Sequence, residues 1–187
     1  ERFSMLNGEA TRSKTITTRV ESATRLWFRT SLDDKALTAA EPRGEVVHSL
    51  AIEGFVRIPD LMLEEIEPFS AKQPFEECGD SLAPVRALSG ITLGPGYRKA
   101  VLDRIGGLRG CTHFLTLALG LVELHTLVTF LQMRGDAPYE NRDDGEWMAA
   151  GLRIEPRLVD ACIALRRESP VIVRAMDAAG RDDGPVK

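Results

Sequence analysis

The chain has 187 residues, 43% of them hydrophobic, which is enough for one domain with a substantial core and short for two. Its net charge of −4 and its pI of about 5.5 come from interspersed acidic and basic residues, without the basic stripe that neutralises nucleic-acid phosphates. We therefore expect one domain over residues 1–187, with an ordered core from about 15 to 176 and no nucleic-acid partner.

The apolar segments are short for a membrane helix. The longest, residues 114–124, is interrupted by Thr116 and Glu123 and is shorter than the roughly 20 residues that a bilayer requires. The first residues also lack an apolar run of signal-peptide length, and three cysteines are an odd and low number for a disulfide framework. These features predict a cytoplasmic protein with free or metal-binding thiols and no membrane partner.

The N-terminal half is predicted to form an antiparallel sheet of four or five strands over residues 15–72. Its segments are rich in Thr, Val, Trp and Phe with partial alternation, and Pro59 and Asp60 form a turn before the last one. Pro68 within that last segment favours a short or edge strand. The candidate strands are "TITTRVES" (15–22), "RLWFRTSL" (25–32), "EVVHSLAIEGFVRI" (45–58) and "LMLEEIEPFSA" (61–71).

The apolar spacing changes to a helical period after this region. A short helix is expected over residues 82–88, and a clearer one begins near Pro95 and ends at two glycines, Gly106 and Gly107. Thr112 is the expected N-cap of the longest element, a helix over residues 113–133. One face of this helix is apolar and is expected to cover the sheet, and it carries Leu117, Leu121, Leu124 and Val128.

The C-terminal third is predicted to contain little regular structure. Residues 134–147 are charged and carry glycine and proline, which indicates a loop, and residues 155–169 are expected to form a short helix that ends before Pro170. The last ten residues are expected to form a frayed tail. The predicted fold is therefore α+β, with an antiparallel sheet in the N-terminal half packed against a long helix and shorter helices.

Cys111 and His113 stand at the expected start of the long helix. A helix N-terminus presents unpaired N–H groups and the positive end of the helix dipole, which favour a thiolate and a neutral imidazole. Both forms suit a base, a nucleophile or a metal ligand. The alternative is that Cys111 is a small buried apolar residue and that His113 bonds a neighbouring carbonyl group.

Two further residues extend this set. His48 shares its strand face with Leu50 and Ile52, so it is expected to point into the core, where a structural histidine is the commoner finding. Cys78 lies in the polar turn "FEECGDS", and with His48, Cys111 and His113 it could complete a zinc site. The signal is weak, because no Cys-x2-Cys pair is present and the four residues come from three elements.

The sequence "TSLDDKA" contributes an aspartate near the end of a strand. Asp33 and Asp34 point to opposite faces of the sheet, so at most one of them can reach an interior site. Tyr97 at a helix start is either a hydrogen-bond donor to a ligand or a packing residue. Signatures of phosphate loops, nucleophile elbows and His-Glu-x-x-His zinc enzymes are absent from the sequence.

A stripe of small and polar residues follows the long helix at helical spacing. His113, Thr116, Gly120 and Glu123 are three, four and three residues apart and therefore share one face. This stripe is either the solvent-facing side of the helix or the wall of a pocket between helix and sheet, in which Gly120 leaves room for a ligand.

These motifs resemble, in their order, a bacterial family known as domain of unknown function 2889. The resemblance covers about residues 20–135, and the block "GGLRGCTHFLTL" carries it most specifically, with weaker contributions elsewhere. Where relatives tend to carry Arg-Asp-Asp-Gly before the tryptophan, this chain has "SATRLW". The weaker matches are Arg19, Trp27, "LDDK" (32–35), His48, Cys78 and "LSGITLGPGYRKAV" (88–101).

The resemblance implies a role in aromatic catabolism. Members of this kind are often encoded beside genes for the breakdown of aromatic or acyl-CoA compounds, and a lyase acting on lignin-derived phenolics, such as a γ-formaldehyde lyase, fits that setting. We therefore expect a cofactor-independent lyase or isomerase with an aromatic small-molecule substrate, and a homodimer is compatible with the sequence. The alternative is a zinc-binding accessory protein or a small-molecule-binding protein without catalysis.

The expected site combines residues from the sheet and the long helix. His48 and His113 are the expected acid and base, because an imidazole titrates nearest neutral pH, and Asp34 is expected to orient one of them. Substrate contacts are expected from Arg19, Tyr97, Cys111, Thr116 and Gly120. The zinc alternative instead uses His48, Cys78, Cys111 and His113.

Overall fold

The computed structural model describes residues 8–38 and 42–182, and the chain divides into two compact units. The first unit is Glu1–Leu124 and the second is His125–Lys187. The expectation of one domain over residues 1–187 stays a prediction. The second unit has an apolar cluster of its own, so the C-terminal residues do not depend on the sheet for burial.

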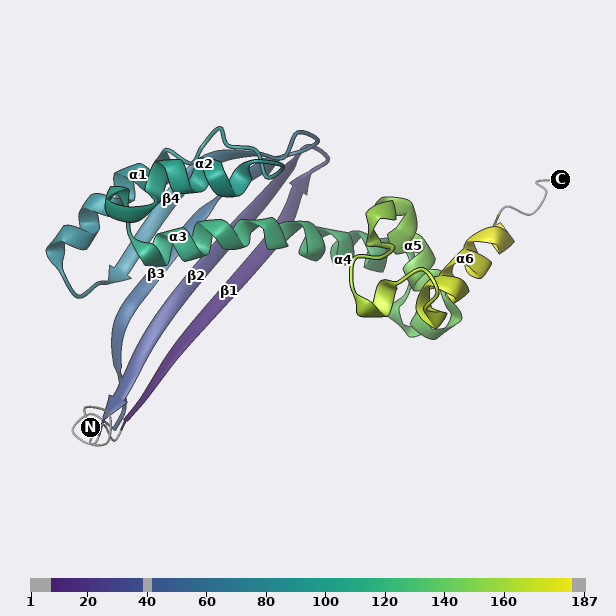
Figure 1. Cartoon of the computed structure of the whole chain (residues 1–187), viewed down its shortest axis with the longest axis horizontal. Helices are drawn as coiled ribbons and strands as arrows, with labels where there is room; N and C mark the ends of the chain where they lie inside the picture. The colour runs from purple at the N-terminus through teal and green to yellow at the C-terminus, as the bar shows by residue number, and fades with distance from the viewer. Residues whose placement is uncertain (1–7, 39–41, 183–187) are drawn as a thin grey trace. The chain divides into compact units, whose positions relative to one another are not determined.

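The first unit is built on a four-stranded antiparallel sheet in the order β1-β2-β3-β4 (Figure 1). The α+β fold and the antiparallel sheet predicted from the sequence are confirmed, and the last strand is an edge strand as expected. The first two strands are longer than predicted, because the strand continues through polar residues beyond each predicted segment, whereas the last two match their predicted bounds to within one residue. They are β1 (Gly8–Ser22), β2 (Arg25–Thr38), β3 (Glu45–Arg57) and β4 (Met62–Lys72).

One face of the sheet is buried. On β2 the residues Phe28, Thr30 and Leu32 are buried in alternation with more exposed neighbours, as the two-residue period of a strand requires. Gly54 on β3 is the cross-strand partner of Phe28. A Cβ at Gly54 would lie 3.2 Å from the Phe28 ring and 2.7 Å from the Ile66 side chain. The absence of a side chain at Gly54 therefore gives room for the largest residue of this face.

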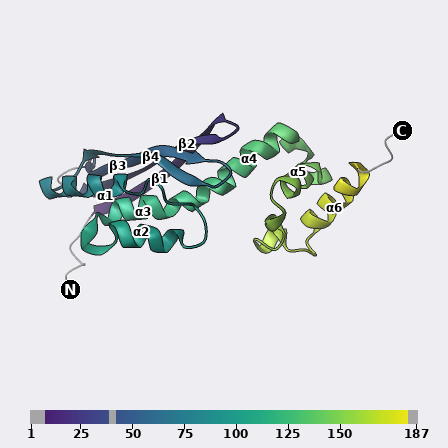
Figure 2. The same ribbon diagram turned by 90° about the horizontal axis from the view of Figure 1, so that it is seen from above.

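Three helices follow the sheet, and α2 and α3 form a layer on its buried face (Figure 2). Leu117, Leu121 and Leu124 of the predicted apolar face are buried, whereas Val128 is half-buried and belongs to the second unit. The helices of this unit are α1 (Leu82–Arg86), α2 (Tyr97–Ile105) and α3 (Thr112–Leu119), with 3-10 turns η1 (Glu76–Ser81), η2 (Gly107–Arg109) and η3 (Gly120–Glu123).

The helical run that begins with α3 is longer than the sequence predicted. It continues through Asp136, and the whole stretch Thr112–Asp136 has 25 residues and a mean hydropathy of 1.8 in its most apolar window. By length and composition alone it could cross a membrane, which corrects the expectation that no segment is long enough. A helix that covers a protein core meets the same criterion, and the inward face of α3 is buried against the sheet.

The second unit is helical around Met133, Met148, Ile172 and Ala175. Residues 134–147, predicted as a loop, are partly helical, and the helix expected over 155–169 is replaced by two 3-10 turns. The predicted tail belongs in part to α6, which starts at Pro170 because proline is tolerated in a first helical turn. The elements are α4 (Leu124–Asp136), η4 (Tyr139–Asp144), α5 (Glu146–Ile154), η5 (Pro156–Leu158), η6 (Ile163–Leu165) and α6 (Pro170–Asp182).

Candidate active site

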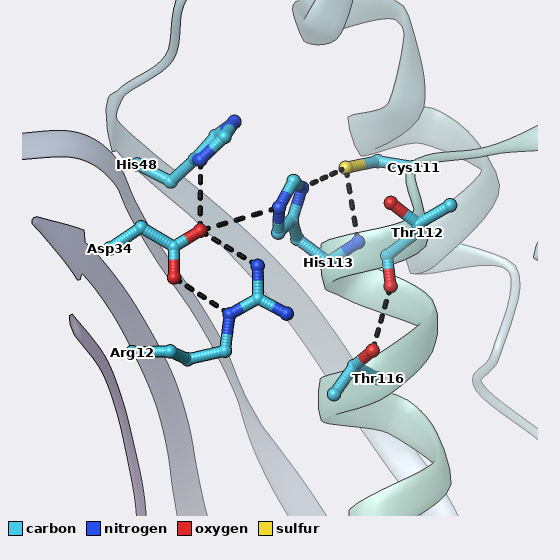
Figure 3. Close-up of polar contacts among 7 residues, drawn as sticks. All are labelled: Arg12, Asp34, His48, Cys111, Thr112, His113 and Thr116. Atoms are coloured by element: carbon cyan, nitrogen blue, oxygen red, sulfur yellow. Dashed lines mark hydrogen bonds and ion pairs between the residues drawn. The ribbon is translucent and has the colours of Figure 1, made fainter. Parts of the chain in front are cut away.

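Three residues predicted as catalytic meet on the buried face of the sheet, at the start of α3. Asp34 on β2 and His48 on β3 are directly paired across the two strands, and a register shift follows between Asp34 and Lys35. His113 lies in the first turn of α3 and points toward both of them (Figure 3). The alternation argument was therefore correct for His48 and for Asp34.

Asp34 Oδ2 is the common partner of both imidazoles. It lies 3.0 Å from His48 Nδ1 and 3.4 Å from His113 Nε2, and the two ring centroids are 3.9 Å apart with an angle of 35° between the ring planes. The side chains of Asp34, His48 and His113 are only 16%, 17% and 18% exposed. The cluster is thus compact and largely shielded from solvent.

Arg12 on β1 completes the cluster and was not anticipated. Its Nε donates to Asp34 Oδ1 at 2.7 Å and its Nη2 donates to Asp34 Oδ2 at 2.8 Å, across the β1–β2 register. These hydrogen bonds, chiefly, lower the pKa of Asp34 and keep it ionised. Only the strand register could have identified Arg12, because nothing in its local sequence distinguishes it from other strand arginines.

The hydrogen-bond geometry fixes the ring protons. A carboxylate only accepts, so neutral His48 carries its proton on Nδ1, and its Nε2 keeps a free electron pair on the side away from Asp34 (Figure 3). Burial, together with the neighbouring His48 and Arg12, lowers the pKa of His113 below its ordinary value, although Asp34 opposes this effect. Neutral His113 is therefore the resting form at neutral pH.

Cys111, and not Thr112 as predicted, is the N-cap of α3. Its Sγ accepts the backbone N–H of His113 at 3.4 Å and also lies 3.4 Å from His113 Nδ1. The other ring nitrogen, Nε2, lies 3.4 Å from Asp34 Oδ2, so the His113 ring stands between the thiol and the carboxylate. Gly110 before it is required by close packing, because a Cβ there would lie 2.8 Å from the carbonyl oxygen of Ile105.

A pocket of about 650 Å³ opens beside these side chains. One wall carries His48, Cys111 and His113, and the apolar part of the rim carries Phe75 and Leu108, which are 67% and 109% exposed. Large apolar side chains exposed at the rim of a concave site are typical of ligand binding. The pocket is therefore suited to a small molecule with an apolar body.

The comparisons with known proteins place this site within a family. Residues 11–126, more than half of the chain, match the family described as protein of unknown function (DUF2889). The chain belongs to the DUF2889 family. No curated protein and no solved structure matches the chain.

The DUF2889 match coincides closely with the first unit. It contains Arg12, Asp34, His48, Cys111 and His113, and it ends two residues after that unit. The family resemblance read from the sequence is confirmed. All described residues of the candidate site therefore lie in the part of the chain that defines membership of DUF2889.

Four of the residues predicted to contact substrate lie elsewhere. The Tyr97 hydroxyl is buried and donates to the carbonyl of Ala118 at 2.7 Å, and burial raises the pKa of Tyr97. The Arg19 guanidinium lies over the Trp27 ring at 4.5 Å and pairs with Glu21. Neither residue borders the pocket beside His48.

The predicted stripe on α3 faces the sheet only in part. Thr116 is exposed and its hydroxyl donates to the carbonyl of Thr112 (Figure 3). Gly120 is buried, and a Cβ there would overlap the Lys14 side chain, so this glycine leaves room for lysine and not for a ligand. Lys14 Nζ also lies 3.9 Å from Glu123 Oε1.

The zinc set predicted from the sequence is changed by the structure. Among the described residues, the cluster whose ligand atoms all lie within 4.8 Å of one another consists of Asp34, His48 and His113. Cys78 borders the same pocket from η1, and Cys111 contacts the outer nitrogen of His113. The candidate metal ligands in the structure therefore include the carboxylate of Asp34 in place of the two predicted cysteine ligands, Cys78 and Cys111.

Proposed function

We propose that the protein is a cofactor-independent lyase that acts by acid–base chemistry on an aromatic, lignin-derived phenolic compound. The observation that carries this proposal is the sharing of Asp34 by two imidazoles beside a pocket with an apolar rim. A base, its orienting carboxylate and a substrate-sized space are the minimum set for proton-transfer catalysis.

His48 is proposed as the base. Its Nδ1–H is fixed by Asp34, so Nε2 presents its electron pair away from the carboxylate, in the arrangement that serves a base in other carboxylate–histidine pairs. The positive charge of Arg12 compensates the negative charge of Asp34, so Arg12, Asp34 and neutral His48 together carry no net charge before the reaction. A proton taken up by His48 is then stabilised by the same carboxylate.

His113 is proposed as the second acid–base group. Its ring contacts His48 at a centroid distance of 3.9 Å, and its pKa is lowered chiefly by burial and next by His48. A proton on one ring therefore disfavours a proton on the other. This relation suits a reaction in which one histidine accepts a proton from the substrate while the other histidine donates a proton to the product.

Release of formaldehyde from a phenolic dimer is one reaction that fits. The base removes the proton of a γ-hydroxyl group, and the Cβ–Cγ bond breaks to release formaldehyde. The electron pair of that bond forms a Cα=Cβ double bond, and the benzylic ether oxygen leaves with its own electron pair and takes up a proton. The step is redox-neutral and needs one base and one acid.

The apolar rim supports an aromatic substrate. Phe75 and Leu108 expose large apolar surfaces beside the two imidazoles, and burying such surface against an aromatic ring stabilises the complex.

Replacing His48 with glutamine tests the assignment. We expect His48→Gln to lower turnover of a phenolic dimer with a hydroxymethyl group next to a benzylic ether by about 10²- to 10⁴-fold, because the base is lost. Formaldehyde and alkene products are measured together. The matched control is His125→Gln, because His125 belongs to the second unit and pairs with Glu155 at 2.9 Å. Equal rates in both variants and the wild type contradict the assignment.

A second candidate is a metal-binding protein that uses Asp34, His48 and His113. Tetrahedral zinc bonds of about 2.0–2.2 Å place neighbouring ligand atoms about 3.3–3.6 Å apart, and Asp34 Oδ2 lies 3.0 and 3.4 Å from the two nitrogens. Against it stands Arg12, whose guanidinium occupies both oxygens of Asp34 and adds a positive charge. We therefore propose it as the alternative.

Metal analysis separates the two candidates. The acid–base proposal expects less than about 0.1 equivalent of zinc, iron or manganese after purification, and turnover that survives a chelator. Near-stoichiometric metal that is lost in both Asp34→Asn and His113→Gln but kept in His125→Gln supports the alternative and rejects the metal-free mechanism.

A further inference from the structure

Cys111 has no part in the proposed lyase reaction, yet it stands at the end of a continuous chain of polar contacts. Its Sγ lies 3.4 Å from His113 Nδ1, His113 Nε2 lies 3.4 Å from Asp34 Oδ2, and Arg12 holds Asp34 through two hydrogen bonds. We propose that Cys111 is a nucleophile for soft carbon electrophiles, with His113 as its base and Asp34 as the residue that positions His113.

The arrangement has the three parts of an activated nucleophile. A nucleophile must contact its base, and the base must be oriented by a third group. His113 meets this condition because its two nitrogens contact the thiol on one side and the carboxylate on the other. The neutral state of His113, favoured by burial, leaves Nδ1 able to receive the thiol proton.

The start of α3 stabilises charge on the sulfur. As the thiol proton moves to His113 Nδ1, the sulfur becomes negative, and the backbone N–H of His113 already points at it from 3.4 Å. The imidazolium that forms is stabilised by Asp34. The negative thiolate and the positive imidazolium are therefore both stabilised by groups that are in position before the reaction.

The pocket indicates the class of electrophile. Cys111 borders the pocket whose rim carries Phe75 and Leu108, so the reacting carbon should belong to an apolar, planar molecule. An α,β-unsaturated aryl ketone or a quinone methide fits. The Sγ–C bond forms at the β-carbon, the π electrons move to the carbonyl oxygen, and that oxygen or the α-carbon takes the proton from His113. The addition is redox-neutral and needs no further reactant.

This inference shares the pocket of the proposed function but does not require turnover. Wild-type protein is treated with an excess of phenyl vinyl ketone, and the modified cysteines are quantified over time by peptide mass spectrometry. The chain supplies two internal controls, because Cys78 borders the same pocket and Cys162 is exposed in the second unit. We expect Cys111 to react at least about tenfold faster than Cys162, despite being less exposed.

Variants show whether His113 causes this difference. His113→Gln should lower the rate at Cys111 by about tenfold or more and leave the rate at Cys162 unchanged, whereas His125→Gln should alter neither. Asp34→Asn tests the positioning role with a second, independent change and should also slow Cys111. A Cys111 rate no greater than that of Cys162, or one unchanged in both His113→Gln and Asp34→Asn, overturns the proposal.

The outcomes separate this inference from the proposed function. Fast alkylation of Cys111 without release of formaldehyde from any phenolic dimer rejects the lyase proposal alone. Turnover of the dimer with slow alkylation rejects the nucleophile alone.

Discussion

Replacement of Asp34 by asparagine is expected to lower turnover of the phenolic dimer by about 10³-fold or more. The carboxylate accepts from His48 Nδ1 and from two nitrogens of Arg12, and its Oδ2 lies 3.4 Å from His113 Nε2. An asparagine side chain offers one oxygen and an NH2 group that cannot accept, so His48 is free to adopt the wrong tautomer. Arg12 also loses its charge partner. Steady-state rates of formaldehyde release measure the effect.

The adjacent aspartate is the matched control. Asp33 is paired with Ser49 on β3, whereas Asp34 is paired with His48, so the two carboxylates lie on opposite faces of the sheet. Asp33→Asn removes the same charge one residue away and is expected to change turnover by less than about twofold. Similar losses in both variants mean that net charge or general stability, and not the shared carboxylate, sets the rate.

Replacement of Phe28 by alanine is expected to lower the free energy of unfolding by about 3–5 kcal/mol. Phe28 is fully buried at the centre of β2 and faces Gly54, which has no side chain with which to fill the space. Truncation therefore leaves a cavity in addition to the lost apolar transfer energy. Urea unfolding followed by circular dichroism gives the difference.

Phe69→Ala is the companion variant. Phe69 lies on the edge strand β4 and is 42% exposed, with the Arg29 guanidinium 5.6 Å from its ring centre. Its loss is expected to cost about 1 kcal/mol or less, because solvent already reaches the ring. A Phe28→Ala cost that does not exceed the Phe69→Ala cost contradicts the assignment of Phe28 to the core of the first unit.

Much of the candidate site followed from strand and helix periodicity. Alternation placed His48 with Leu50 on the inward face and allowed only one of Asp33 and Asp34 to join it, and both statements hold in the structure. A histidine in the first turn of the helix that covers the sheet then had to lie near that face. The meeting of His113 with His48 was therefore predictable from local patterns combined with one packing assumption.

Other features depend on information that is not local. Arg12 belongs to the site only because β1 pairs with β2 in a register that sets it beside Asp34. Threonine is found more often than cysteine at the N-cap of helices, yet the N-cap of α3 is Cys111 and not Thr112. Cys111 directly follows the closely packed Gly110. Helices α5 and α6 were not predicted, because they follow charged segments that resemble loops, although residues 146–154 are amphipathic.

The stripe on α3 shows how a correct spacing can have another cause. His113 and Gly120 do face the sheet, but Gly120 accommodates the end of the Lys14 side chain. Small residues on an inward helix face mark close approach of some group, and the sequence alone does not say whether that group is a ligand or the protein itself.

The contact between the two imidazoles over a single carboxylate oxygen has a further consequence. A positive charge on one ring disfavours a positive charge on the other across so short a distance, so we expect the cluster to bind at most one added proton at a time. A proton that the two histidines take from the substrate must therefore return to the product or to solvent before the next catalytic cycle begins.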